Sequence, residues 1–290
     1  MAHNVRKAVF PVAGLGTRLL PASKAIPKEM ATVVDRPVIQ YAIEEARSAG
    51  IEEFIFVTCR GKASIEDHFD VDVALEAELR SKGKDDALED VASTELPTGS
   101  FTCIRQGRPL GLGHAVWCAK ALVGNEPFAV VLPDDVFLSD KPVLQQMTEA
   151  YDRVGGNMLA VVEVPREKTN KYGILDIGDD DGTIATVKGM VEKPNPADAP
   201  STLSVVGRYI LQPEVMTALD DQEPGKGGEI QLTDAIARAI GHQKVVGFRY
   251  EGERFDCGDK AGFVMANLAF GLRNKDVGPS LKKMIAQLSR

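Results

Sequence analysis

Short apolar runs alternate with stretches of helical spacing over the first half of the chain, and this alternation is the strongest constraint on its fold. The run Phe128–Leu132 is almost continuously apolar, as expected for a strand of a parallel sheet covered on both faces. Three further runs predict strands, at Lys7–Val12, Glu53–Cys59 and Phe101–Arg105. Helical spacing is found at Pro37–Ser48, Gly113–Ala121 and Pro142–Val154. We therefore predict an α/β fold with a doubly wound, mostly parallel sheet.

The second half of the chain shifts toward strands and turns before it returns to helices. Expected strands are Asn157–Val164, Gly173–Ile177, Thr183–Val191 and Leu203–Leu211, and expected helices are Gln231–Ile240 and Lys260–Arg273. The tail Ser280–Arg290 is amphipathic and basic, which predicts a terminal helix packed on the body. We expect a single domain over 1–290, with parts at about 1–155, 156–260 and 260–290.

The stretch at about 70–100 differs from its surroundings. It is acidic and rich in Ala, Leu, Glu and Lys, and it ends in the turn-rich sequence Leu-Pro-Thr-Gly-Ser. This composition predicts one or two amphipathic helices inserted between strands. The insertion is either a solvated excursion or a lid or subunit contact.

Composition excludes several classes of protein. The net charge of −8 argues against nucleic acid as a partner. The four cysteines show no CxxC spacing, which argues against a zinc or redox motif. Met1–Phe10 lacks the apolar core of a signal peptide, and no stretch approaches the roughly 18 apolar residues of a membrane span. We therefore expect a cytoplasmic enzyme without a membrane partner.

A glycine loop follows the first expected strand. It reads Ala13-Gly14-Leu15-Gly16-Thr17-Arg18, and Pro27-Lys28-Glu29-Met30 follows shortly after. A dinucleotide-binding fingerprint needs a third glycine where this chain has Leu19, and the Gly-Lys-Ser/Thr of a P-loop is absent. The remaining interpretation is a loop that wraps a triphosphate, with Arg18 and Lys28 as its charge partners.

A second glycine-rich turn, Gln106–Gly113, leads into a helix. The Gln106 amide can both donate to and accept from the edge of a base. Gly111 and Gly113 allow the backbone to approach a ligand closely. His114 is better explained as a packing or capping residue at the helix start.

Carboxylates follow two of the later runs. Asp134 comes directly after Phe128–Leu132, at the strand end where ligands of open α/β sheets bind. A carboxylate there suits Mg²⁺, which takes few protein carboxylates together with substrate phosphates. We expect Asp135 to serve the turn or a helix cap. Asp256 offers a second carboxylate, and Asp259 is placed to cap the next helix.

The run from Ala13 to Met30 resembles the signature of sugar-1-phosphate nucleotidylyltransferases, most closely that of bacterial UTP–glucose-1-phosphate uridylyltransferases. Their usual opening is Gly-Gly-x-Gly-Thr-Arg or Ala-Gly-x-Gly-Thr-Arg, and this chain has the alanine form. The resemblance continues through essentially the whole chain, at Tyr172-Gly173, Val191–Pro194, Val205–Tyr209 and Gly228–Asp234. It implies UTP and glucose 1-phosphate as substrates, Mg²⁺ as cofactor and a homo-oligomer, either a dimer or a tetramer.

The resemblance also implies roles for individual residues. Residues implied to bind the nucleotide, in a part at about 1–155, are Ala13, Gly14, Gly16, Thr17, Glu29, Gln106 and Gly111. Residues implied to bind the sugar phosphate, in a part at about 156–260, are Gly173, Glu192, Lys193 and Val206. Asp134 and Asp256 would hold the metal, and Arg18, Lys28 and Lys193 would serve catalysis. The role of Gly228–Asp234 stays open between shaping the sugar side and holding a helix or subunit contact.

The implied reaction is an in-line attack of the sugar phosphate on the α-phosphorus of UTP. Its nucleophile is already an anion, which accounts for the absence of a Ser-His-Asp or Cys-His set. The nearest alternative is a thymidylyltransferase, although Pro27–Met30 and Gly111–His114 fit a uridylyltransferase better. A non-catalytic nucleotide-binding relative would be expected to lose the carboxylates or the basic arm. A nicotinamide dehydrogenase fails on the glycine pattern.

Overall fold

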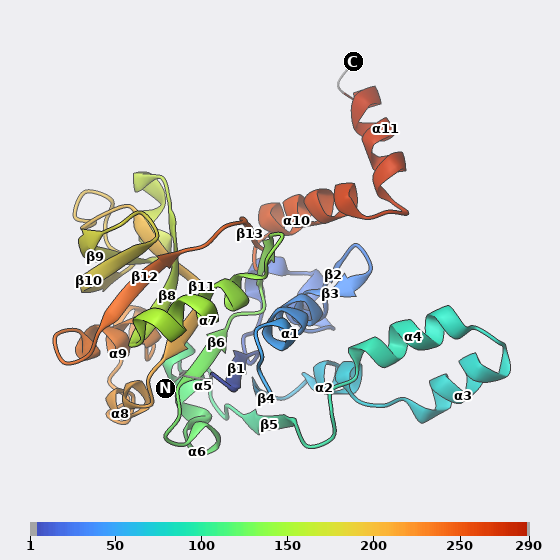
Figure 1. The fold of residues 1–290 in the computed structure, drawn as a ribbon, viewed down its shortest axis with the longest axis horizontal. Helices are drawn as coiled ribbons and strands as arrows, with labels where there is room; N and C mark the ends of the chain where they lie inside the picture. Colours follow the sequence, from blue (N-terminus) through green and yellow to red (C-terminus); the bar gives the residue numbers. More distant parts are fainter. Residues whose placement is uncertain (1–4, 289–290) are drawn as a thin grey trace.

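The computed structural model describes residues 5–288, and a nine-stranded sheet runs through it (Figure 1). In spatial order the strands are β5 (Phe101–Arg105), β4 (Glu53–Thr58), β1 (Lys7–Pro11), β6 (Phe128–Val131), β11 (Leu203–Leu211), β8 (Asn157–Glu163), β12 (Val245–Arg249), β10 (Ile184–Glu192) and β9 (Gly173–Asp180). The predicted mixed α/β class is confirmed.

The first four strands of this order are parallel and carry helices on both faces. Alternate residues of β1 show why. Ala8 and Phe10 join the apolar cluster under α1 (Val38–Ser48), α2 (Ala63–Phe69) and α7 (Val143–Val154). Val9 faces the other way, toward α5 (Leu112–Cys118) and α6 (Lys120–Val123). Because both of their faces are buried, β1, β4 and β6 are largely apolar rather than alternating, whereas the edge strand β5 leaves Thr102 and Arg105 exposed.

The rest of the sheet is mostly antiparallel. β11 pairs antiparallel with both β6 and β8, and β9 pairs with both β10 and β11. Five strands, β11, β8, β12, β10 and β9, therefore close into a ring. Within residues 5–288 the β8–β12 pairing is the one parallel pair of this ring. A mostly parallel sheet is thus found only in the first half, because tight turns such as that between β9 and β10 favour antiparallel neighbours.

A two-stranded sheet that the sequence analysis did not predict lies beside the large one. It pairs β7 (Asp135–Leu138) with β13 (Glu253–Asp256), and its register places Asp256 opposite Asp135. The helix α10 (Lys260–Arg273) follows directly, and the Asp259 carboxylate accepts from the Gly262 N–H at 2.8 Å. Asp259 is therefore the helix cap that the sequence predicted.

The insertion forms two helices, α3 (Val73–Ser81) and α4 (Asp85–Thr94), which project from the body beside α2 (Figure 1). Neither helix buries a residue, so the insertion contributes little to the core. The remaining described elements are short or flank the ring. They are the helices α8 (Glu214–Ala218) and α9 (Leu232–Ala239), the strands β2 (Thr32–Val33) and β3 (Arg36–Pro37), and five 3-10 turns at Thr17–Leu19, Ala22–Lys24, Lys28–Met30, Arg166–Lys171 and Lys226–Gly228.

The terminal helix corrects one prediction. α11 spans Gly278–Leu288 and extends away from the body after α10 (Figure 1). Within it only Gly278 is buried, and the Leu288 side chain is 78% exposed. The expected packing on the body is wrong, because α11 extends beyond the body and its residues after Gly278 stay exposed or only partly buried. Residues 289 and 290 of the predicted tail lie outside the described residues. Among residues 5–288, no helix combines the length and apolar character needed to cross a membrane.

Candidate active site

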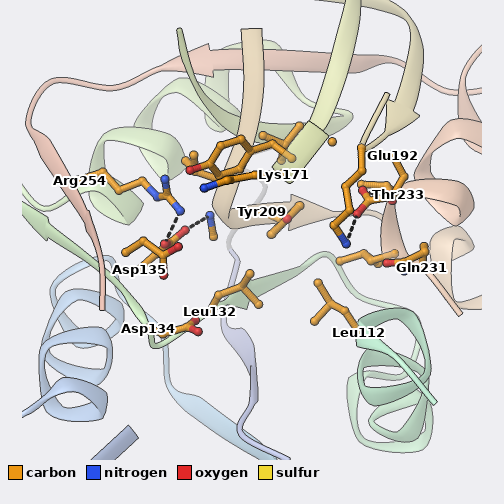
Figure 2. A pocket seen from close by; sticks show the side chains of 18 of the residues that line it. Leu112, Leu132, Asp134, Asp135, Lys171, Glu192, Tyr209, Gln231, Thr233 and Arg254 are labelled. Atoms are coloured by element: carbon orange, nitrogen blue, oxygen red, sulfur yellow. Dashed lines mark hydrogen bonds and ion pairs between the residues drawn. The ribbon is translucent and has the colours of Figure 1, made fainter. Parts of the chain in front are cut away.

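A cavity of about 840 Å³ lies between the parallel strands and the ring (Figure 2). Arg254, Asp134 and Asp135 stand on one side of it. Glu192, Thr233 and Gln231 stand on the other, with Tyr209 between the two groups. Predicted site residues that line the cavity are Arg18, Asp134, Gly173, Glu192, Lys193, Val206 and Asp256.

The loops after the parallel strands carry the predicted nucleotide residues. The glycine loop follows β1, Cys59–Lys62 follows β4, Gln106–Gly111 follows β5 and Leu132–Asp134 follows β6. Backbone bonds hold neighbouring loops together, for example from the Gln106 N–H to the Thr58 carbonyl at 2.9 Å. Because the strands are parallel, all four loops meet at one edge of the sheet, where ligands of open α/β sheets bind.

Gly16 is required by the shape of the glycine loop. Its φ of 66° lies in the left-handed region, which favours glycine. A Cβ at this position would lie 3.1 Å from the Lys28 Cβ and 3.2 Å from the Ser23 Cβ. The Ser23 hydroxyl donates to the Gly16 carbonyl at 2.7 Å. The loop is therefore folded back on the segment that bears Lys28.

Lys28 and Asp134 form a partly buried ion pair. The Lys28 ammonium donates to the Asp134 carboxylate. Burial alone would raise the pKa of Asp134, but the Lys28 charge outweighs it and holds that pKa below its usual range. The Asp134 carboxylate is therefore ionised. Its partner, Lys28, is one of the two cations that were predicted to bind the triphosphate.

The pairing of β13 with β7 brings Asp256 close to Asp134. The Cys257 N–H donates to the Asp134 carbonyl at 2.7 Å, which continues the β7–β13 pairing to the end of the turn. The Asp256 carboxylate accepts from Arg18 at 3.3 Å. Burial raises the pKa of Asp256, and the neighbouring charges of Asp135 and Asp134 raise it further.

The Asp134 and Asp256 carboxylates face one small space beside Gly258. A Cβ on Gly258 would lie 2.8 Å from Asp134 Oδ2, 2.9 Å from Asp256 Oδ1 and 2.7 Å from an Arg18 guanidinium nitrogen. Hard oxygen donors that converge on a space kept clear by a glycine fit a Mg²⁺-type cation. Within residues 5–288, no three His, Cys, Asp or Glu side chains are grouped to hold a metal by themselves. The remaining ligands would have to come from substrate and water.

Asp135 has a different role from the turn or cap that was predicted. It begins β7 and is buried, accepting from Arg254 at 2.6 Å and from the Gly207 N–H at 2.7 Å. The Arg254 guanidinium lies 5.5 Å from the centre of the Tyr172 ring and lines the cavity. The sequence analysis missed Arg254, although its place two residues before Asp256 on a short strand could have indicated it.

The sugar-phosphate residues come together where β9 and β10 pair. The register places Glu192 opposite Gly173, and the Lys193 N–H donates to the Tyr172 carbonyl at 2.9 Å. The Glu192 carboxylate accepts from Thr233 at 2.9 Å and pairs with the Lys193 ammonium at 2.9 Å. Lys193 has a left-handed φ of 47°. Such strain at a non-glycine residue is typical of functional sites.

The segment Gly228–Asp234 joins the two sides of the cavity. The Ile230 N–H donates to the Leu110 carbonyl, and the Ile230 carbonyl accepts from the Gly113 N–H, both at 2.8 Å. Gly111 has a φ of 111°, and a Cβ on it would lie 2.7 Å from the Ile230 carbonyl oxygen. Since Thr233 holds Glu192, this segment fixes the Gln106–Gly113 loop against the sugar-phosphate residues. Of the two roles left open for Gly228–Asp234, the structure therefore favours that of shaping the cavity.

Several predicted residues lie outside the lining of the cavity. Glu29 is buried and pairs with Lys62, which the sequence analysis missed, at 2.6 Å. The Gln106 amide nitrogen donates to the Gly111 carbonyl at 3.1 Å and to the His114 Nδ1 at 3.0 Å. Burial lowers the pKa of His114, so its neutral ring accepts this bond and supports Gln106. The other predicted residues outside the lining are Ala13, Gly14, Gly16, Thr17, Lys28 and Gly111, of which Gly14 and Thr17 are exposed.

The nucleotidyl transferase family matches residues 7–271. The chain is 56% identical, over 260 residues, to a UTP–glucose-1-phosphate uridylyltransferase of Komagataeibacter xylinus, covering 90% of this chain and 92% of that protein.

Two solved structures are also similar. A UTP-bound UGPase from Acinetobacter baumannii is 45% identical, with a TM-score of 0.90 and coverage of 98% of this chain and 99% of that one. A UDP-glucose pyrophosphorylase complexed with UDP-glucose is 41% identical, with a TM-score of 0.85 and coverage of 93% and 100%.

The space beside Gly258 gives a direct test of cation binding. Gly258→Ala places a methyl group between the two carboxylates and the guanidinium, and we expect the affinity for Mn²⁺ to fall about 10-fold or more, as for displaced ligands in other metal sites. Titration followed by electron paramagnetic resonance measures the free ion. Gly189→Ala is the control, because a Cβ there would meet the Asp176 Cβ at an ordinary 3.5 Å. Unchanged Mn²⁺ affinity in folded Gly258→Ala would contradict the assignment.

Proposed function

We infer that this chain, which belongs to the nucleotidyl transferase family, transfers the uridylyl group of UTP to α-D-glucose 1-phosphate and releases pyrophosphate. The observation that carries the mechanism is a single cavity between two sets of residues. One set follows the ends of the parallel strands, and the other lies where β9 and β10 pair. The volume of about 840 Å³ is within the usual range for a small-molecule site.

The reaction requires the two substrates to be positioned, and it does not require a nucleophile from the enzyme. A sugar phosphate has its second pKa near 6, so its attacking oxygen is an anion at neutral pH and needs no general base. The barrier is then lowered by holding two anionic substrates in line and by neutralising the charge that builds on pyrophosphate. Both tasks need cations on each side of the α-phosphorus.

Arg18 and Lys28 supply the cations on the nucleotide side. Each already faces a carboxylate across the cavity edge, Arg18 with Asp256 and Lys28 with Asp134. Arg18 can hold two phosphate oxygens at once, whereas Lys28 acts as a point charge. In this proposal the Gln106–Gly111 loop reads the uracil, and the backbone N–H groups of the glycine loop hold the triphosphate.

Asp134 and Asp256 would hold Mg²⁺, which supplies positive charge shared by the phosphates of both substrates. Lys193 and Glu192 act on the sugar side. The Lys193 ammonium, which forms an ion pair with Glu192 in this structure, would bind the incoming phosphate. The Glu192 carboxylate would accept hydrogen bonds from sugar hydroxyls. Gly173 and Val206 line this end of the cavity. Glycine is needed at position 173, because a Cβ there would lie 2.8 Å from the Thr233 methyl group.

The proposal covers one domain with two working parts. The part at about 1–155 binds nucleotide, the part at about 156–260 binds sugar phosphate, and the helices at about 260–290 follow. The β11–β6 pairing, which makes one continuous sheet of both parts, supports a single domain. We place the reaction in the cytoplasm. All four cysteines are free thiols, as is usual in a reducing compartment.

Lys193 and Lys120 offer a matched pair for a test of the site. Each side chain is 41% exposed and forms an ion pair with a carboxylate. We expect Lys193→Ala to lower kcat about 100-fold or more, since removing one oriented charge at a reacting group costs that much elsewhere. Asp134→Asn should do the same, and Lys120→Ala should leave kcat unchanged. Pyrophosphate release with UTP, Mg²⁺ and glucose 1-phosphate measures kcat.

The same assay separates the remaining alternatives. Replacing UTP with dTTP distinguishes a uridylyltransferase from a thymidylyltransferase, and galactose 1-phosphate tests the sugar. Normal turnover by folded Lys193→Ala or Asp134→Asn would refute the role assigned to that residue. No pyrophosphate release by the wild-type protein would refute the reaction itself.

We extend the proposal to a homo-oligomer formed through α10 and α11. The exposed apolar residues on these helices are Val264, Met265, Leu268, Met284 and Leu288, and Val277 directly before α11 is exposed as well. Those around α11 recur at helical spacing and form one stripe. The helix extends away from its own body (Figure 1), so a second copy that presents the same stripe would bury both.

Sedimentation velocity tests this contact. We expect the wild-type protein to sediment as a dimer or tetramer, and Met284→Glu with Leu288→Glu to shift it toward smaller species because two charges enter the apolar contact. Leu75→Glu on α3 tests separately whether the insertion forms the subunit contact, since Leu75 is also exposed, at 41%, but lies on the insertion. A wild-type monomer at micromolar concentration, or an unchanged assembly in the double variant, would contradict the proposal.

A further inference from the structure

The turn that carries Asp134 is held from behind by a buried arginine. Arg208 lies on β11 with its side chain 1% exposed, and it pairs with Glu45 of α1, whose side chain is 9% exposed. The pairing of β11 with β8 shifts register between Val205 and Tyr209. Irregularities of this kind turn a side chain away from its regular direction in the sheet. The register shift therefore falls in the part of β11 that contains Arg208, the residue that holds the turn.

Every N–H of the Arg208 guanidinium has an acceptor. Nε and Nη2 donate to the two oxygens of Glu45 at 3.0 and 2.7 Å. Nη1 donates to the carbonyls of Leu132 and Gly207, both at 2.9 Å. Nη2 also donates to the Asp135 carbonyl at 3.0 Å. These five bonds use the full donor set of an arginine, and two of them reach the carbonyls on either side of Pro133-Asp134.

Neighbouring contacts fasten the same turn to β11. The Leu132 N–H donates to the Gly207 carbonyl at 2.8 Å, and the Gly207 N–H donates to the Asp135 carboxylate at 2.7 Å. A Cβ on Gly207 would lie 2.6 Å from an Asp135 carboxylate oxygen. Glu45 also accepts from the Leu144 N–H at 2.8 Å, which ties α7 to the pair.

We propose that Arg208 is a positioning residue for nucleotidyl transfer: it fixes the carbonyls of Leu132 and Asp135, and thereby the orientation of Asp134. The inference rests on the proposed function. Lysine cannot replace it, because three donors on one atom cannot reach Glu45 and three carbonyls in different directions. Arg208 touches the turn and never the substrate, so its loss should disorder Asp134 without removing a binding group.

The test must separate positioning from stability. Removing Arg208 alone would leave Glu45 buried and unpaired, whereas replacing both partners with apolar residues of similar size is often neutral for stability. We therefore choose the double variant Arg208→Met with Glu45→Met, and Arg208→Lys as a second variant that keeps the charge. Arg249→Met is the control, because Arg249 pairs with Asp180 in the ring, away from the turn.

Hydrogen–deuterium exchange of the substrate-free protein and steady-state kinetics form the readout. We expect both Arg208 variants to exchange faster at 132–138, with kcat about 100-fold lower, as a misplacement near 1 Å can produce, and KM for glucose 1-phosphate within about 3-fold. Thermal unfolding shows which variants fold. If the double variant does not fold, the result for Arg208→Lys decides the test.

Normal kcat in a folded variant would overturn the proposal, as would a low kcat with unchanged exchange at 132–138. Exchange does not depend on catalysis. A wild-type protein without uridylyl transfer would refute the proposed function alone.

Discussion

The pairing of β11 with β6 on one side and with β8 on the other is the constraint on which the site depends. It joins a parallel sheet, whose strand ends all carry loops, to a ring of five strands. The cavity exists because these two parts cannot move apart without breaking a continuous ladder of backbone hydrogen bonds. β11 also supplies Val206, Gly207 and Arg208, so the strand that joins the parts also shapes the cavity and holds the aspartate turn.

The charges around the cavity form an alternating series. Lys62 pairs with Glu29, Lys28 with Asp134, Arg18 with Asp256 and Arg254 with Asp135. The Lys62–Glu29 pair is buried and the Arg254–Asp135 pair nearly so, and a buried charge that loses its partner costs about 3–5 kcal/mol. The Arg18 side chain is 60% exposed, so solvent screens its pair with Asp256 and the pair adds little stability. The cations next to Asp134 and Asp256 are already placed for phosphate.

Local patterns in the sequence predicted much of the fold. The four parallel strands, α1, α7 and α10 follow from apolar spacing, and the glycine loop from its residues. Pairing between distant segments could not be predicted in this way. β7 and β13 are four-residue strands without a distinctive pattern, yet their register is what brings Asp256 to Asp134. The partners of Arg208 and Arg254 have the same limitation, because they lie 163 and 119 residues away in sequence.

In the proposed mechanism, catalysis is the direct, in-line reaction of two positioned substrates, with no covalent enzyme intermediate. The stereochemical course at phosphorus tests this most directly. UTP carrying a sulfur of defined configuration on its α-phosphorus is converted with glucose 1-phosphate, and the configuration of the sulfur-labelled UDP-glucose is read by phosphorus NMR. A single in-line attack predicts inversion. Retention would mean two successive displacements through an enzyme nucleophile and would contradict the account.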